Sequence, residues 1–510
     1  MKFNNIFQGI NKNLRSVIKR FSMGDYIDLL LNTSPLTHEI NKKGKRLAFT
    51  NCNVFDGISS DIKKDMTVLV DGDKILDFGS GELIIIPDDF YTIDMEGRTL
   101  MPGLIDSHIH GCSPFTYIAN ASAVRQMPMQ VALNNMRTVY CGVTTICDMG
   151  GPQGIIKEFT KLSDKNHIPA PRFLNCYTLI SPIKGKNLGY PSQVKELNPL
   201  KSWLLEGQVA TRPKTLEALK SACYKVKDDG GTHLKTTYQP YPFSRKKFVS
   251  RDNFPVFDDD WMKTILRIGK ETGLVVDIHA PYGAGAERCV DLSIETGSNI
   301  RIQHVTFDMD IKEIVLRKMK DYGISMIPTV MVFGDSFHLP EFISWLKNDP
   351  NTYMMPEANM QSKAQIQKGI DLEPYSGQMI LEQDHVYFRE NFDHVRRNTQ
   401  RAHDLGIIGL GTDIGGTSTG FFGRLYSEIT HYVEFGIPFF DILKCLTSVN
   451  AEINGLNDRG IIQRGKLADL IWVEGNPLKD ISVINKVSTV MKGGVFLKYK
   501  GKELTASSNS

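Results

Sequence analysis

The sequence contains no apolar run long enough to cross a bilayer and almost no excess of either charge. A membrane-spanning helix needs about 20 consecutive apolar residues, so we expect no transmembrane helix. The 60 Lys and Arg residues nearly balance the 57 Asp and Glu residues, which gives a formal net charge of +3. Nucleic-acid binding relies on a strongly basic surface. Since no nucleic-acid-binding motif is present either, we expect no nucleic-acid partner.

The sequence also lacks closely spaced cysteines, because its eight cysteines are scattered and form no Cys-x-x-Cys motif. Disulfide frameworks are typical of small secreted chains, whereas a chain of 510 residues is long enough to bury a large core. We therefore expect buried free thiols and a reducing, cytoplasmic compartment.

Residues 1–45 are predicted to form an N-terminal extension that contains an amphipathic basic helix. Apolar residues between Ile6 and Phe21 recur at helical spacing, with lysines and arginines between them. The segment lacks the continuous apolar core and the cleavage site of a signal peptide. We favour a helix that docks on the body of the protein or on another subunit. A helix at a membrane surface and an organelle-targeting segment are the alternatives.

From residue 100 onward, short apolar runs alternate with amphipathic helical stretches. The predicted strands are residues 101–110, 143–148, 172–180, 232–238, 274–280, 300–305, 324–330 and 407–413. Eight β/α units are typical of a (β/α)8 TIM barrel, whereas an open doubly wound sheet, the alternative, normally has fewer. We therefore predict an α/β barrel over residues 100–460.

Short strands flank this region on both sides. Residues 46–54 and 66–78 read as strands, with a hairpin turn at residues 71–73. We predict that residues 46–99 and 461–504 form one small β-sandwich-like domain, followed by a tail at residues 505–510. Two long inserts, near residues 181–211 and 334–391, interrupt the barrel, and we expect them to shape substrate binding or subunit contacts.

Polar side chains occur at the expected carboxyl ends of five barrel strands. They are His108, His110, Lys235, His279, His304 and Asp413. Each one alone has a structural explanation, such as a hydrogen-bonded core histidine or an aspartate that caps a turn. Strand ends of one barrel converge on one region, however, and neutral imidazole and carboxylate are good ligands for zinc-like ions. Together these residues predict a metal site. His108 and His110 can both belong to it, because alternate residues of a strand share one face.

The sequence from residue 47 to 498 resembles the amidohydrolase superfamily, especially its prolidase-like and imidazolonepropionase-like members. The motifs that carry this resemblance are MPGLIDSHIHG at 101–111, GVTTICDMGG at 142–151, GTD at 411–413, TSVNA at 447–451 and GKLADL at 465–470. The resemblance implies a barrel enzyme that hydrolyses a carbon–nitrogen bond. It also implies a homo-oligomer, which the N-terminal helix would suit.

The same resemblance implies a centre of two divalent metal ions, commonly zinc. The implied ligands are His108, His110 and Asp413 for the more buried ion, and His279 and His304 for the more exposed one. Lys235 would bridge the ions as a carboxylated lysine, because an ammonium cannot bind a cation whereas a carbamate can. The alternative is a mononuclear site with unmodified Lys235, because His233 lies on the same strand face as Lys235.

The implied mechanism uses a bridging hydroxide that the metals activate, with Asp413 as general base and then general acid. An N-acyl amino acid or a dipeptide would be the small-molecule substrate. Tyr238 is a candidate to bind that substrate or to serve only in packing, and Arg288 or Lys184 is a candidate to receive a substrate carboxylate. The Gly-Gly-His-Gly turn that this group usually carries after strand 3 is replaced by residues 181–189, which include no histidine.

Three other functions stay open at this point. A deaminase or cyclic-amide hydrolase of the same superfamily is one, although deaminases usually carry His-x-x-Glu where Ala280, Pro281 and Tyr282 follow His279 here. A cysteine enzyme that uses Cys112 would need a positioned base, and the sequence offers none. A barrel that has lost catalysis and serves as a scaffold is the non-enzymatic alternative.

Overall fold

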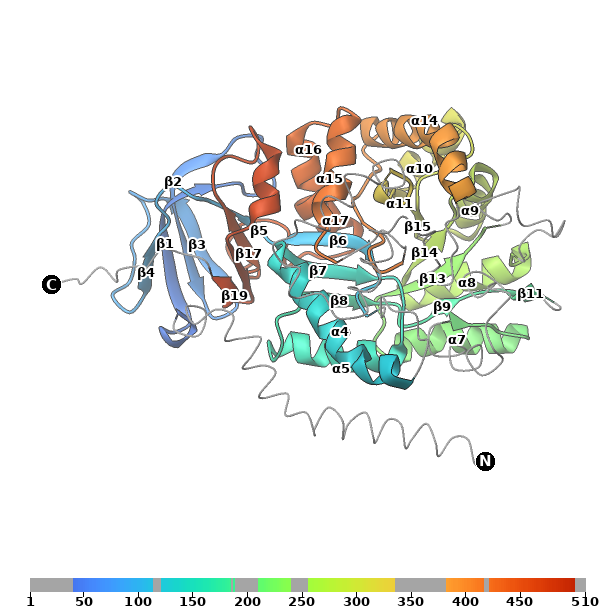
Figure 1. Ribbon diagram of the computed structural model, residues 1–510, viewed down its shortest axis with the longest axis horizontal. Coiled ribbons are helices and arrows are strands. Elements are labelled where there is room, and N and C mark those ends of the chain that lie inside the picture. Colours follow the sequence, from blue (N-terminus) through green and yellow to red (C-terminus); the bar gives the residue numbers. More distant parts are fainter. Residues whose placement is uncertain are drawn as a thin grey trace.

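A computed structural model describes residues 40–112, 121–184, 187–188, 210–239, 256–334, 382–416 and 422–499 of the chain. The predicted N-terminal helix, most of the two inserts and the predicted tail lie outside these residues. The molecule has a β-rich part and an α/β part, which lie next to each other along its longest axis (Figure 1).

The β-rich part is built from both ends of the chain, which meet in one eight-stranded sheet. Its strands are β1 (Arg46–Val54), β2 (Lys63–Asp71), β3 (Lys74–Ser80), β4 (Tyr91–Asp94), β5 (Thr99–Pro102), β17 (Leu470–Val473), β18 (Thr489–Lys492) and β19 (Val495–Tyr499). The antiparallel pairing of β5 with β17 joins the early strands to the late ones. Between β2 and β3 the chain reverses through Gly72, whose φ of 60° favours glycine.

The α/β part contains two parallel sheets, in which the predicted strands follow one another in order. The first sheet pairs β6 (Leu104–Ile109), β7 (Val143–Asp148) and β8 (Arg172–Asn175). The second contains β12 (Ala210–Thr211), β9 (Leu179–Ile180), β13 (His233–Thr237), β14 (Val275–His279), β15 (Ile300–Gln303) and β16 (Ser325–Ile327), in that order. A separate antiparallel pair is formed by β10 (Ile183–Lys184) and β11 (Asn187–Leu188).

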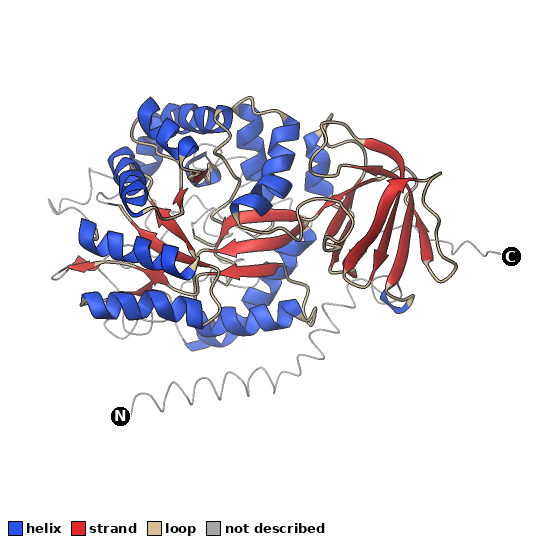
Figure 2. Ribbon diagram, turned by 180° about the vertical axis from the view of Figure 1, so that it is seen from behind, coloured by secondary structure: helices blue, strands red, loops and turns tan. Residues whose placement is uncertain are grey.

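Helices surround these strands on the outside (Figure 2). They are α4 (Ala121–Tyr140), α5 (Gln153–Asp164), α7 (Leu216–Asp228), α8 (Asp259–Thr272), α9 (Gly283–Thr296), α10 (Glu313–Asp321), α11 (Met331–Gly334), α14 (Glu382–Asp404), α15 (Leu425–Glu434), α16 (Phe439–Lys444) and α17 (Asn450–Ile453). A π-helical turn (Cys445–Val449) joins α16 to α17, and a 3-10 helix (Ile481–Lys486) precedes β18. The α7 and α8 helices begin at the capping side chains of Thr215 and Asp258.

The predicted eighth strand, residues 407–413, is wrong as a regular strand. This segment makes only isolated bridges, from Ile408 to Met326 of β16 and from Ile414 to Ile109 of β6. Asp413 has a φ of 56°, which breaks the extended conformation. Regular strand pairing among the described residues therefore gives separate parallel sheets of three and six strands rather than one closed ring.

The prediction of buried, unpaired cysteines holds for seven of the eight. All eight cysteines are free, and all but Cys141 are buried. In the part of the chain that the structure describes, none of the helices combines the length and the apolar character of a membrane span.

Candidate metal centre

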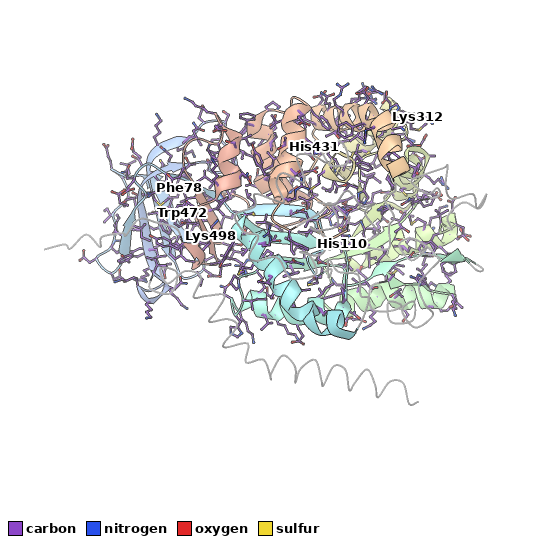
Figure 3. The ribbon with its side chains drawn as sticks, in the orientation of Figure 1. Phe78, His110, Lys312, His431, Trp472 and Lys498 are labelled. Carbon is purple, nitrogen blue, oxygen red and sulfur yellow. The ribbon has the colours of Figure 1, made fainter. Side chains whose placement is uncertain are left out.

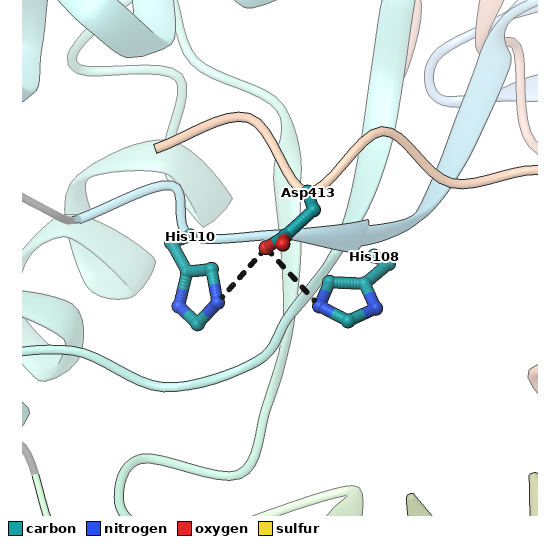
Figure 4. A group of neighbouring side chains, drawn as sticks. All are labelled: His108, His110 and Asp413. Atoms are coloured by element: carbon teal, nitrogen blue, oxygen red, sulfur yellow. Dashed lines mark ion pairs between the residues drawn. The ribbon is translucent and has the colours of Figure 1, made fainter. Parts of the chain in front are cut away.

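Three potential metal ligands meet where β6 ends. The Nε2 atoms of His108 and His110 each lie 3.3 Å from Oδ1 of Asp413 (Figure 4). The irregular segment 407–416 holds Asp413 in place, because the backbone N–H groups of Thr412 and Asp413 both donate to the carbonyl oxygen of His108. Figure 3 shows His110 in the α/β part, well away from Trp472 in the small sheet. The predicted trio of His108, His110 and Asp413 is therefore brought together.

The outer hydrogen bonds of the two histidines fix where their protons lie. Nδ1 of His110 bonds the carbonyl oxygen of Gly150 at 2.7 Å, and Nδ1 of His108 bonds Oε1 of Gln303 at 2.6 Å. Both partners can only accept, so each Nδ1 donates, and in a neutral ring Nε2 then presents a lone pair to Asp413.

Asp413 is the third acceptor at this point. Its Oδ1 atom is buried and has no hydrogen-bond donor among the described residues. Three converging acceptor atoms repel one another unless a cation lies between them, so this donor set suits a divalent ion.

Two further histidines adjoin this trio. The ring centroid of His304 lies 4.8 Å from that of His108 and 4.3 Å from that of His279. His304 follows β15 with a φ of 70°, and its Nδ1 lies 2.7 Å from the hydroxyl oxygen of Thr329. Nε2 of His279, the last residue of β14, bonds Oε1 of Gln239 at 2.6 Å. Strained backbone such as that of His304 and Asp413 tends to occur at functional sites.

Lys235 of β13 is buried, with an exposed fraction of 4%. Its Nζ atom has no hydrogen-bond partner among the described residues. Burial lowers the pKa of this lysine, and its charge lowers the pKa values of His108 and His279. A buried ammonium without an acceptor is costly, so the surroundings favour an uncharged amine or a modified side chain at this position.

The electrostatics favour a neutral ring at His108 and an ionised carboxylate at Asp413. Burial lowers the pKa of His108 to about 4. Burial acts to lower the pKa of His110 too, but the adjoining carboxylate of Asp413 raises it above its usual value. Burial acts to raise the pKa of Asp413, but the neighbouring His108 and His110 hold it well below its usual range. Neutral imidazole and carboxylate are the forms that bind a metal ion.

A second group of potential ligands consists of Cys147, His233 and Asp277, whose ligand atoms lie within 4.8 Å of one another. The guanidinium of Arg301 supplies the positive charge there in place of a metal ion. Its Nε donates to Oδ1 of Asp277 at 2.7 Å, and its Nη2 lies 3.7 Å from the sulfur of Cys147. His233, which shares a strand face with Lys235, therefore belongs to a group that an arginine already neutralises.

The remaining sequence candidates are less informative. Tyr238 is about half-buried, and its backbone N–H donates to the carbonyl oxygen of His279 at 2.8 Å. Arg288 is engaged by Asp259 at the start of α8, so a substrate carboxylate would have to compete with that pair. Burial raises the pKa of Cys112 well above its usual value, which disfavours a thiolate nucleophile. The side chain of Lys184 lies outside the described residues.

Sequence reasoning missed the polar residues behind the histidines, above all Gln303, Asp277 and Thr329. Asp277 and Gln303 are fully buried within strands that otherwise read as apolar. A buried polar group needs a partner, so a polar residue within an apolar strand next to a candidate ligand was the signal that could have identified them.

Known proteins resemble this chain in sequence and in fold. The model of the amidohydrolase family matches residues 99–497. A crystal structure of a Xaa-Pro dipeptidase with bound methionine is 21% identical, covers 89% of this chain and all of its own (100%), and superposes with a TM-score of 0.66. An ochratoxinase of A. niger is 18% identical, with coverage of 91% and 99% and a TM-score of 0.65.

One curated relative matches a shorter stretch. A dihydroorotase of Wolbachia sp. subsp. Drosophila simulans (strain wRi) is 36% identical over 106 residues, which are 21% of this chain and 23% of that protein. The chain therefore matches less than a quarter of the length of this relative.

Proposed function

Because the chain belongs to the amidohydrolase family, and is a hydrolytic enzyme that acts on carbon–nitrogen bonds, we propose that it is a metal-dependent hydrolase of small amide substrates. The substrate would be an N-acyl amino acid or a dipeptide. The observation that carries the proposal is the convergence of Nε2 of His108 and Nε2 of His110 on Oδ1 of Asp413, each at 3.3 Å. The similarity to a dipeptidase supports this substrate class.

The proposal includes the predicted architecture. Residues 407–416 would complete a (β/α)8 barrel, because their backbone bonds both β16 and β6. The domain limits would be the predicted ones, with a barrel at 100–460 and one small β-sandwich-like domain at 46–99 and 461–504. Assembly into a homo-oligomer and a cytoplasmic location stay predictions from the sequence.

The metal ligands would be the predicted set, in a centre of two zinc ions. His108, His110 and Asp413 would hold the more buried ion, and His279 and His304 the more exposed one. Lys235 would bridge them as a carbamate, since an uncharged amine is the form that reacts with carbon dioxide and burial favours that form. When bound, two such ions lower the pKa of a water molecule and polarise the scissile carbonyl.

The residues of the chain would then move the proton. Asp413 would accept the proton of the attacking water and deliver it to the leaving nitrogen. Tyr238, half-buried beside the strand end that carries His279, would donate a hydrogen bond to the substrate.

The test combines metal analysis with a substrate screen. The purified protein should contain about two zinc ions per chain, and it should hydrolyse members of a panel of N-acyl amino acids and dipeptides. His108→Ala should lose metal, whereas His167→Ala, a change in the connection between α5 and β8, should keep it. One ion per chain would favour a mononuclear site with unmodified Lys235, and no bound ion would contradict the proposal and favour the scaffold function.

The match to a dihydroorotase favours a second candidate function, the hydrolysis of a cyclic amide. The panel should therefore include dihydroorotate and other cyclic amides. Turnover of cyclic amides together with inertness toward dipeptides would select this second candidate.

A further inference from the structure

The imidazole of His108 is linked to the protein interior through three polar side chains. Gln303 ends β15, Arg301 lies two residues earlier on that strand, and Asp277 lies on the neighbouring β14. All are buried, with exposed fractions of 0% for Gln303 and Asp277 and 3% for Arg301. Since polar groups at this depth are held by their hydrogen bonds, their donors and acceptors can be assigned.

The assignment begins at Arg301, whose guanidinium can only donate. Its Nε donates to Oδ1 of Asp277 at 2.7 Å, and its Nη2 donates to Oδ2. Its Nη1 donates to Oδ1 of Asn454, which anchors the arginine at the end of α17. Both oxygens of Asp277 are therefore acceptors.

The acceptor atoms of Asp277 determine which atoms of Gln303 donate and accept. Its Nε2 donates to Oδ1 of Asp277, so its Oε1 must be the atom that faces Nδ1 of His108, at 2.6 Å. An amide oxygen only accepts, and Nδ1 of His108 must therefore carry the ring proton.

We infer that Arg301, Asp277 and Gln303 form a positioning relay that holds His108 in the tautomer able to bind a cation. In the other tautomer, Nε2 would donate its proton to Asp413 and would exclude a metal ion. This inference rests on the proposed function, since a cation is the group that uses the lone pair on Nε2. Among the described residues, His110 meets the carbonyl oxygen of Gly150, His304 the hydroxyl of Thr329 and His279 the amide oxygen of Gln239, whereas the series of Gln303, Asp277 and Arg301 leads to His108.

Two substitutions of Gln303 separate the relay from simple packing. Gln303→Met fills a similar volume but offers no acceptor to His108. Gln303→Glu keeps an oxygen at Nδ1 of His108 and shares one proton with Asp277. The relay predicts that Gln303→Met raises the Kd for zinc by about 10–100-fold, whereas Gln303→Glu stays within a few-fold of the wild type. If Gln303 served only in packing, Gln303→Glu should raise the Kd for zinc more than Gln303→Met, because methionine introduces no charge into the core.

The measurement is a zinc titration of metal-free protein against a chromophoric chelator, together with ¹⁵N NMR spectra of the histidine rings. In the metal-free wild type and in Gln303→Glu, His108 should be protonated at Nδ1, and Gln303→Met should give a mixture of tautomers. Gln400→Met is the matched control, since Gln400 of α14 donates to the carbonyl oxygen of Phe435 and lies outside the relay. Arg301→Lys, which keeps a cation beside Asp277 with fewer donors, should give a smaller rise in Kd and serves if Gln303→Met does not fold.

The outcomes separate the two proposals. Unchanged zinc affinity in folded Gln303→Met, with His108 still protonated at Nδ1, would overturn the relay and leave the proposed function intact. A wild-type protein that binds no zinc would overturn both.

Discussion

At the scale of single residues, Asp413 is both buried and, among the described residues, without a hydrogen-bond partner for its Oδ1 atom, a combination that is rare in proteins. This Oδ1 atom lies 3.3 Å from Nε2 of two imidazoles. A buried acceptor without a donor costs about 1–3 kcal/mol. Such an arrangement persists where binding or catalysis requires it, and the proposed function gives Asp413 both tasks.

Asp413→Asn should therefore lower kcat by about 10²–10⁴-fold, because an amide cannot accept the proton of the attacking water. The measurement is steady-state hydrolysis of the best substrate from the panel, with metal content measured in parallel. Asp404→Asn, a change at an exposed carboxylate at the end of α14, is the control and should leave kcat unchanged. Near wild-type kcat in Asp413→Asn would remove Asp413 from proton transfer.

Glu428 of α15 is a second buried carboxyl group with an unusual environment. It accepts the backbone N–H groups of Val330 at 2.8 Å and Met331 at 2.7 Å, immediately after Thr329, the partner of His304. Burial raises its pKa from 4.5 to about 8, with Asp106 acting in the same direction and His431 in the opposite one. The folded protein therefore holds a proton on Glu428 at pH values where the unfolded chain has released it.

This difference predicts how stability depends on pH. Because the folded state binds more protons between the two pKa values, the contribution of Glu428 is fully present below its unfolded pKa and is lost as the pH rises through about 8. The wild type should therefore lose stability relative to Glu428→Gln between about pH 5 and about pH 9. Urea unfolding at several pH values measures this difference, with Glu452→Gln on an exposed position as the control. A difference that stays constant with pH would contradict the raised pKa.

At the scale of elements, side chains supplement the backbone bonds that join the segment 407–416 to β16 and β6. The N–H group of Leu410 donates to Oδ1 of Asn450 at 3.0 Å, and that of Thr412 faces Oδ1 of Asp106 at 3.1 Å. Nδ2 of Asn450 in turn donates to the carbonyl oxygens of Ile105 and Leu410, both at 2.7 Å. Asn450 thus joins β6 to the segment that carries Asp413.

Asn450→Ala should destabilise the protein by about 3 kcal/mol, because it leaves buried backbone groups on both segments without partners. It should also weaken metal binding, since β6 carries His108 and His110 while the other segment carries Asp413. Chemical denaturation and zinc titration measure the two effects. Asn476→Ala, which removes a local turn contact with Leu478 far along the chain, should change stability by much less. Equal effects of the two substitutions would contradict the bracing role of Asn450.

The sequence predicted most elements of the α/β part because their periodicity reflects burial. Residues 143–148 were predicted as a strand and form β7, and the predicted strand at 300–305 contains β15 (Ile300–Gln303). The prediction of a regular eighth strand failed because the N–H group of Leu410 bonds the side chain of Asn450, which lies far away in the sequence, and because Asp413 has a positive φ. Tyr177, with a φ of 59°, likewise divides the predicted third strand into β8 and β9.

The grouping of the candidate ligands could be predicted from the sequence, whereas the details of their contacts could not. Strand ends place side chains toward one region, so His108, His110 and Asp413 could be grouped before any geometry was known. The proton positions could not be predicted, because they depend on Gln303 and Gly150, and neither residue has a spacing that links it to a histidine.

At the scale of the whole molecule, polar contacts fasten the small sheet to the α/β part. Arg172, the first residue of β8, pairs with Asp469 through Nε at 2.9 Å. Nζ of Lys498 on β19 donates to the carbonyl oxygen of Tyr140 at the end of α4, at 2.9 Å, and Figure 3 shows Lys498 at this junction. Because the trio of His108, His110 and Asp413 begins on β6, directly after β5 of the sheet, this junction fixes where the candidate site begins.

Lys492 makes the most buried of these contacts, with an exposed fraction of 0%. Its Nζ donates to the carbonyl oxygens of Ser163 and Ala170, both at 2.7 Å, and to the hydroxyl of Ser163 at 2.8 Å. Lys492→Met should keep the packing of the stem but leave these acceptors without their donor, which should destabilise the protein by about 3 kcal/mol. Chemical denaturation measures this loss, with Lys479→Met at an exposed position as the control.

A second prediction for Lys492→Met concerns whether the chain unfolds in one cooperative transition. If the junction couples the sheet to the α/β part, Lys492→Met should shift one cooperative transition for the whole chain, because both parts lose stability together. The difference in fluorescence between the wild type and Trp472→Phe isolates Trp472 in the sheet from the other three tryptophans, whereas loss of bound zinc would report on His108 and His110. Coincident transitions by both signals are expected for the wild type, and Lys492→Met should move them together. Separate transitions in the wild type would contradict the coupling and would show that the sheet unfolds independently of the metal site.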